Sequence, residues 1–229
     1  MVDDSASKKG PGAGVQAIGA VVLAVGVVGT VWGLSKVLPD HSDDPATCSN
    51  DRPTQTARHV SGAQLCEALN RPDLAALLGT PDEHAIGANG NRTWSNPADG
   101  SKEAKQATAE ANVQLKTYSV KLSASFDADG VAGMRRFLGT GANAHAETLR
   151  GHSAVLYSDR TIAFSFDGGK AHTGTGGIAR HLLVASAPKD GGDLFELVIW
   201  RQDDVPPDDA ALTRVAERVL PTLPGWHDS

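Results

Sequence analysis

Apolar residues are concentrated in one run near the start of the chain, from Ala13 to Leu34, where Gln16 and Thr30 are the only polar side chains. A helix needs roughly 20 predominantly apolar residues to cross the hydrocarbon core of a bilayer. The run is long enough, and Pro39 ends the segment. We therefore predict a transmembrane helix over residues 13–38.

The charges on either side of this run indicate its orientation. Lys8 and Lys9 precede it, whereas the charges that follow are mainly acidic, at Asp40, Asp43 and Asp44. Because positive charge is retained on the cytoplasmic side, residues 1–12 should form a cytoplasmic tail. A cleaved signal peptide is the alternative, but its apolar region is shorter, about 7–15 residues. We expect a single-pass signal anchor in the cell membrane, with the lipid bilayer as the partner of residues 13–38.

Gly29 and Gly33 have the Gly-x-x-x-Gly spacing that lets two membrane helices approach closely. This spacing allows a homodimer through the anchor. Glycine is frequent in membrane helices for other reasons, so an anchor without a dimer contact is the alternative.

The rest of the chain divides into a polar, proline-containing stalk, residues 39–59, and one extracytoplasmic domain, residues 60–229. Ser61 and Gln64 have the spacing of a capping box, which predicts that a first helix begins there. A second helix is expected from Pro72 up to Gly79.

Beyond the second helix, the pattern predicts a long loop over residues 80–111, around a short strand near Arg92–Ser95. Residues Val113–Phe126 then alternate between apolar and polar side chains, which is typical of a half-buried strand. Since Val113 and Leu115 lie on the opposite parity to the rest, we expect a bulge near Lys116–Thr117.

The second half of the domain combines further strands and helices. The pattern predicts a short helix from Val131 to Gly139, a hairpin of Ala154–Tyr157 with Thr161–Phe166, a strand at Leu194–Trp200 and a helix from Pro207 to Pro221. A glycine-rich segment, Asp167–Gly177, and an ambiguous apolar segment, Ile178–Ala187, lie between them. This order predicts an α+β domain with a mainly antiparallel sheet covered by helices.

The domain is acidic. Beyond Pro39 the chain has 18 Lys and Arg against 25 Asp and Glu, a net charge of −7 with His neutral. Nucleic acid and anionic lipid surfaces are poor partners for such a charge.

Cys48 and Cys66 are the two cysteines of the chain, and both lie in the expected exported part. An oxidising compartment favours their pairing. The bridge would close a loop of about 19 residues and stabilise the fold by ~3 kcal/mol in the chain-entropy model. We predict a disulfide that joins the stalk to the first helix.

Two short motifs resemble catalytic or cofactor-binding sequences but are incomplete. Gly151–Val155 lacks the second glycine of a nucleophile elbow, which would have used Ser153. Gly174–Ala179 matches a dinucleotide fingerprint but has no βαβ unit before it. Neither predicts an active site, and we expect no cofactor.

Carboxylates and histidines provide the remaining candidate chemistry. The densest carboxylate group, at a turn before the last helix, is a weak candidate for a hard cation, because helix capping explains the same residues; its members are Asp203, Asp204, Asp208 and Asp209. The eight histidines have no metal-ligand spacing, although His152 and His172 are near enough along the hairpin to meet. Trp200 is expected to be buried and Trp226 exposed, both as packing residues.

Five segments carry a resemblance to a known family: VSGAQLCEALNRPDLAALLGTP from Val60, TYSVKLSAS from Thr117, LYSDRTIAFSF from Leu156, GGIARHLLVA from Gly176 and VIWRQDDVPPDDAALTRVAERVLPTLPGW from Val198. In these the chain resembles uncharacterised membrane-anchored proteins with a domain of unknown function from high-GC Gram-positive bacteria. Its similarity to cell-envelope lipoproteins with a helix-covered antiparallel sheet is looser, since it has no lipid-acceptor cysteine directly after the apolar run. The resemblance implies location and shape, and no catalytic residues.

These observations lead to three hypotheses. The first is a non-enzymatic extracytoplasmic binding or interaction module, anchored in the membrane, whose partner is an envelope protein or a small ligand. The second is a cell-envelope hydrolase whose residues, such as His152 or the carboxylates, come together only in three dimensions. The third is a subunit of a membrane complex.

Overall fold

The computed structural model describes residues 44–50, 59–95, 106–126, 130–139, 142–167, 170–188 and 190–227. The expected cytoplasmic tail, the anchor over residues 13–38 and its glycines Gly29 and Gly33 lie outside the described residues. Within the described part of the chain, no helix is long and apolar enough to cross a membrane.

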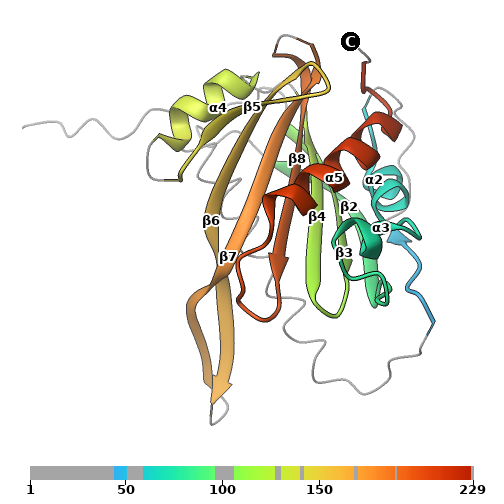
Figure 1. Cartoon of the computed structure of the whole chain (residues 1–229), viewed down its shortest axis with the longest axis vertical. Helices are drawn as coiled ribbons and strands as arrows, with labels where there is room; N and C mark the ends of the chain where they lie inside the picture. The colour runs from blue at the N-terminus through green and yellow to red at the C-terminus, as the bar shows by residue number, and fades with distance from the viewer. Residues whose placement is uncertain are drawn as a thin grey trace, which may run out of the picture.

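One curved, mainly antiparallel sheet forms the frame of the described domain (Figure 1). Its eight strands are β1 (Ser49–Asn50), β2 (Gly87–Ser95), β3 (Gln106–Gln114), β4 (Tyr118–Ser125), β5 (His145–Leu149), β6 (His152–Asp167), β7 (Lys170–Ala187) and β8 (Gly191–Arg201). Their order across the sheet is β1-β2-β3-β4-β8-β7-β6-β5, and the β1–β2 pair is parallel. The predicted α+β class with a mainly antiparallel sheet is confirmed.

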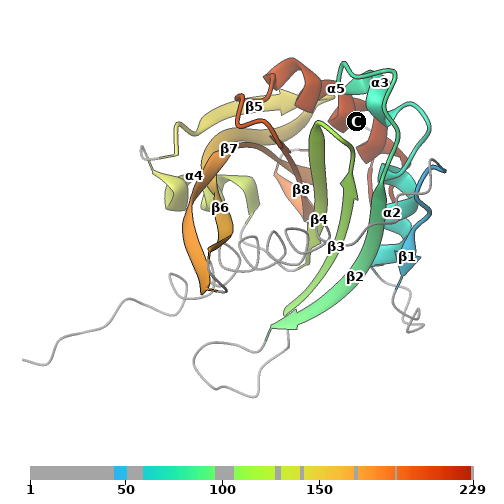
Figure 2. The ribbon, with the colours of Figure 1, turned by 90° about the horizontal axis from the view of Figure 1, so that it is seen from below.

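Helices cover both sides of this sheet. The described α-helices are α2 (Gly62–Leu69), α3 (Leu74–Leu77), α4 (Gly130–Leu138) and α5 (Asp209–Val219), and a 3-10 turn follows at Leu220–Thr222. Figure 2 shows α2, α3 and α5 along the outer side of the curved sheet. We call this side the outer face and the opposite side the inner face.

The outer face carries the main hydrophobic core. Strand residues of one parity, such as Val120 and Leu122 on β4 and Leu197 on β8, are fully buried against the helices. The apolar stripe of α5, which includes Leu212 and Val215, covers them. Burial of each such side chain contributes about 1.5–3 kcal/mol, so the outer face supplies most of the driving force for folding.

A second, smaller core lies on the inner face beneath α4. Val131 of α4 packs with Val155, Leu183, Ala185 and Leu194 of strands β6, β7 and β8. Since alternate residues of a strand point to opposite faces, the neighbours of these residues along the same strands also mark the inner face.

The predicted start of the first helix is confirmed. The Ser61 backbone N–H donates to Gln64 Oε1 at 2.9 Å, and the Gln64 N–H donates to Ser61 Oγ at 3.3 Å. The helix approaches β2 so closely that a Cβ at Gly62 would lie 2.2 Å from the carbonyl oxygen of Asn91. The second helix is shorter than the pattern suggested, with one turn in α3 and Gly79 beyond it at φ 84°.

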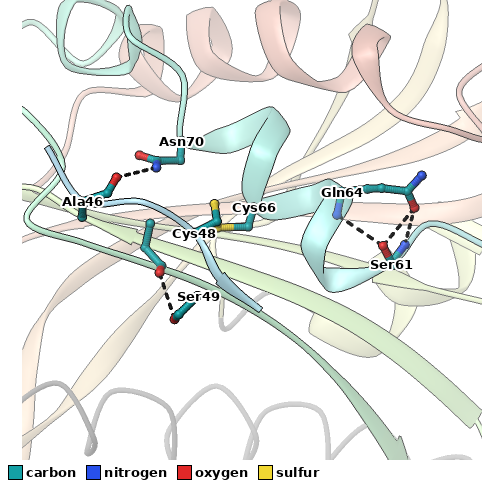
Figure 3. Close-up of a disulfide and its surroundings, with 8 residues drawn as sticks. Ala46, Cys48, Ser49, Ser61, Gln64, Cys66 and Asn70 are labelled. Carbon is teal, nitrogen blue, oxygen red and sulfur yellow. Dashed lines mark hydrogen bonds between the residues drawn. A yellow bond between two sulfur atoms is a disulfide. The ribbon is translucent and has the colours of Figure 1, made fainter. Parts of the chain in front are cut away.

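A disulfide joins Cys48 to Cys66, as predicted (Figure 3). Next to it, the Asn70 amide donates to the carbonyl oxygen of Ala46 at 2.8 Å. The described part of the expected stalk, residues 44–50, therefore lies against the domain, where β1 pairs with β2.

The long loop predicted over residues 80–111 is wrong in part, because β2 and β3 occupy much of it. They pair over nine residues, from Gly87 with Gln114 to Ser95 with Gln106. The bulge predicted at Lys116–Thr117 is instead the turn of the β3–β4 hairpin, so the change of parity there arises from chain reversal.

The predicted hairpin around Ser158–Arg160 is also wrong. These residues continue β6, which pairs with β7 from Ala154 to Asp167, with one irregularity between Arg160 and Ile162. Much of the glycine-rich segment is the first half of β7, where it forms a long arm with β6 (Figure 1). The dinucleotide-like motif at Gly174–Ala179 thus lies within a strand.

Candidate functional site

Polar side chains form a continuous band across the inner face of the sheet. Strand pairing places one residue from each of six strands, β2 to β4 and β6 to β8, side by side in the row Asn89, Asn112, Lys121, Val198, His181, Tyr157. A second row, on one side of the first, contains Asn91, Glu110, Ser123 and Glu196. A third row, on the other side, contains Gln114, Ser119, Trp200, Ala179 and Asp159. We call the polar members of these three rows, together with Trp200, the polar band.

A histidine held by two carboxylates forms one end of the polar band. His181 lies with Nε2 2.9 Å from Asp159 Oδ1 and Nδ1 3.0 Å from Glu196 Oε1. The ring of Tyr157 stacks on His181 at 4.4 Å between centroids, and its hydroxyl donates to Glu196. His181 is almost fully buried, so its interactions with these neighbours replace those with water.

The protonation of this cluster follows from its contacts. Burial opposes the charged imidazole, but the hydrogen bonds to Asp159 and Glu196 outweigh it and raise the pKa of His181 to about 9. Burial likewise opposes the charge of Glu196, yet the hydrogen bond and charge of His181 lower its pKa. Burial, followed by the charge of Glu196, raises the pKa of Tyr157.

These pKa shifts keep the protons in place at neutral pH. Both His181 and Tyr157 remain protonated, so neither is available as a general base. His181, Tyr157 and Glu196 are instead fixed as hydrogen-bonding groups. The charged imidazole and the Glu196 carboxylate are thereby held as an ion pair in a defined geometry.

A buried ion pair lies at the centre of the polar band. Lys121 Nζ is 3.2 Å from Glu110 Oε2, and the two side chains are only 4% and 6% exposed. Both charges are therefore satisfied by each other, in a site where an unpaired charge would be costly.

The other end of the polar band is formed by asparagines whose side chains have unpaired atoms. Asn89 and Asn112 are register partners, and Asn91 lies in the next row. Asn112 is 4% exposed, and neither its Oδ1 nor its Nδ2 has a hydrogen-bond partner. The Oδ1 atoms of Asn89 and Asn91 are also buried and unpaired. Since buried polar groups in folded proteins nearly always have a partner, this end of the band requires an explanation.

Trp200 is a large aromatic member of the polar band and lies between two small residues. Its register partners are Ser119 on β4 and Ala179 on β7, and the indole is partly exposed. The expected burial of Trp200 is therefore incomplete. Trp226, expected to be exposed, is only partly so, because it packs on the outer-face core and stacks on His152 at 3.9 Å.

The carboxylates at the turn before α5 are directed to separate partners. Asp203 binds Arg201, with Oδ2 2.6 Å from Nη2, and Asp209 binds Arg180 at 2.5 Å. Asp208 caps α5 by accepting the Ala210 N–H at 3.0 Å. Asp204, the fourth candidate, has a left-handed backbone with φ 60°. No group of three potential metal ligands is found among the described residues.

The expected hydrolase residues are not brought together. His152 and Ser153 are consecutive in β6, so they point to opposite faces of the sheet. His152 is fully buried, with Nδ1 2.9 Å from the Ala185 carbonyl oxygen. His172 pairs with Ser165, 13 residues further along β6, which places it roughly 40 Å from His152.

The polar band was missed at the level of sequence because its residues come from six separate strands. The one available signal was the alternation in β4, where Lys121 and Ser123 occupy the parity opposite to the apolar residues. That alternation identifies a face, but only strand order shows which residues share it.

Comparison with known proteins gives one match. The model of one protein family covers residues 8–141, and its description assigns no function. Neither the curated proteins nor the solved structures contain a significant match to this chain.

Proposed function

Since the chain belongs to the family of unknown function DUF6215, we propose its function from the site alone: the domain is a binding module that takes a polar ligand on the polar band. The ligand contacts the asparagine end of the band and Trp200. The domain holds this ligand outside the cell, at the membrane in which residues 13–38 anchor it.

The unpaired amide of Asn112 carries this proposal. A buried polar group without a hydrogen bond costs about 1–3 kcal/mol, and Asn112 has two such atoms beside the unpaired oxygens of Asn89 and Asn91. A ligand that pairs with these atoms recovers the cost on binding. Sites with a deficit of this kind bind polar groups in preference to apolar ones.

The remainder of the polar band supports binding more than catalysis. Lys121 is paired with Glu110, and His181 lies between two carboxylates. The raised pKa values of His181 and Tyr157 keep both groups protonated. Such fixed groups orient a ligand without exchanging protons with it.

The binding proposal is tested by co-purification. The full-length protein and the Asn112→Leu variant are purified from native membranes under mild conditions, and the bound species are identified by mass spectrometry. A small molecule or protein that accompanies the wild type and is depleted at least tenfold from the variant supports the proposal. Equal recovery from both, or no bound species with either, contradicts it. Asn70→Ala, on the outer face, is the matched control.

The anchor proposal has its own test. Protease added to intact cells should remove a C-terminal epitope from the full-length protein and leave a short N-terminal fragment in the membrane fraction. An epitope that remains protected until the cells are lysed contradicts the proposed orientation.

A further inference from the structure

We propose that the ligand of the polar band is an uncharged oligosaccharide of at least two rings, with one ring stacked on Trp200 and another hydrogen-bonded to Asn89, Asn91 and Asn112. This inference rests on the proposed binding function and adds the chemical class of the ligand.

We infer that the ligand is uncharged because every ionised group in the polar band already has a partner. Each of them has a partner of opposite charge: Lys121 with Glu110, and His181 with Asp159 and Glu196. The atoms that remain unpaired belong to neutral amides. An ionic ligand would have to break one of these buried pairs, which is costly, whereas a neutral ligand leaves them intact.

The preference for hydroxyl groups follows from the unpaired atoms themselves. They are three amide oxygens, which accept, and one amide nitrogen, which donates. A hydroxyl both donates and accepts, so neighbouring hydroxyls pair with these amides in either orientation of each amide group. A ligand with several adjacent hydroxyls therefore satisfies all four atoms.

Trp200 provides the complementary apolar surface. Ser119 and Ala179 beside it are small, and the indole is partly exposed on the same face as Asn112. An aromatic ring of this kind combines a large apolar surface with a polar N–H. The C–H face of a sugar ring is suited to such a surface, whereas a simple polyol has no comparable flat face.

The size of the ligand follows from the strand spacing. Asn112 and Trp200 are separated by two strand intervals across β3, β4 and β8 and by two residues along the strands. At about 4.8 Å per interval and about 3.4 Å per residue, their Cα atoms are roughly 12 Å apart. One sugar ring does not cover this distance, and two or three linked rings do.

The test uses the full-length protein in nanodiscs, because many detergents carry sugar headgroups that would compete. Cellotriose, maltotriose and triacetylchitotriose are titrated by calorimetry and by tryptophan fluorescence, and trigalacturonate serves as a charged probe of the same size. We expect saturable binding of at least one neutral trisaccharide and at least tenfold weaker binding of its monosaccharide and of trigalacturonate.

Variants assign the binding to the polar band. Asn112→Leu and Trp200→Leu should each lower the affinity for the trisaccharide at least tenfold. Asn70→Ala and Trp226→Phe, on the outer face, should change this affinity less than twofold. Thermal unfolding of each variant identifies loss of folding, and Trp200→Leu gives an independent result if Asn112→Leu does not fold.

The outcomes separate this inference from the proposed function. The oligosaccharide inference is overturned if none of the three neutral trisaccharides binds. It is also overturned if the wild type and both band variants bind them equally well. If a different species still co-purifies in an Asn112-dependent manner, the binding function stands with a ligand of another class. If nothing co-purifies either, both fail.

Discussion

Asn112 and Lys121 face each other directly across strands β3 and β4, yet Lys121 bonds to Glu110, two residues before Asn112 on the same strand. The lysine thus satisfies a carboxylate, and the amide of Asn112 is left with no partner. Two adjacent buried residues therefore differ in their energetic roles: the ion pair is complete in the protein alone, whereas the amide is incomplete until something binds.

Asn112→Leu should stabilise the unliganded protein. The substitution removes two unpaired buried polar atoms and keeps the number and branching of the side-chain heavy atoms, and an unsatisfied group of this kind costs about 1–3 kcal/mol. We expect the free energy of unfolding to rise by about 1–2 kcal/mol, as measured by chemical denaturation of the protein free of ligand. A lower stability would show that Asn112 has a structural hydrogen bond, and the binding argument would lose its basis.

Lys121→Met should be strongly destabilising. It leaves the Glu110 carboxylate buried without its counter-charge, for which a loss of about 3–5 kcal/mol is expected. The double variant Glu110→Gln with Lys121→Met should recover most of this loss, because no unpaired charge then remains. Denaturant titration of the two single variants and the double variant forms a double-mutant cycle, and an additive result would exclude a direct interaction.

Much of the fold follows from local patterns in the sequence. The capping box at Ser61, the apolar stripe of α5 and the alternation in β4 all lead to the observed elements. The first part of β2, before the short strand predicted near Arg92–Ser95, was missed because its Gly and Asn residues have low strand propensity, and pairing with β3 overrides that preference. The turn after β6 was misplaced because Ser158–Arg160 resembles a turn locally, although β7 pairs with that stretch throughout.

The candidate site was much less accessible from sequence. Glu196 and Lys121 are 75 positions apart, and the first link between them is the pairing of β4 with β8. A sequence pattern shows that Lys121 is on the polar parity of its strand, which normally predicts exposure to solvent. The burial of this face, on which the proposed selectivity for a ligand depends, follows from long-range strand order.

Loss of the disulfide should lower stability without changing the polar band. In the chain-entropy model a loop of 15–20 residues corresponds to about 3 kcal/mol. The variant with both Cys48→Ser and Cys66→Ser should lose about that amount, while retaining ligand binding at temperatures where it stays folded. The cysteines lie on β1's side of the outer face, away from Asn112. Reduction of the wild type should reproduce the loss, and unchanged stability after reduction would contradict the prediction.

Stability should fall above and below a plateau at weakly acidic pH because of His181 and Glu196. The pKa of His181 is raised to about 9 in the folded state, from 6.5 in the unfolded chain, so its contribution is complete below about pH 6.5 and is lost as the pH rises through about 9. The pKa of Glu196 is lowered by His181 despite its burial, so its contribution is present above its ordinary pKa and is lost as the pH falls.

Denaturant unfolding at a series of pH values should show a plateau between about pH 5 and 6.5 and a loss of about 3 kcal/mol by pH 9–10. His181→Gln should abolish most of the alkaline decline, while His84→Gln, at an exposed position, should leave it unchanged. An alkaline decline of equal size in His181→Gln would assign it to other groups and remove the argument that a charged imidazole orients this end of the polar band.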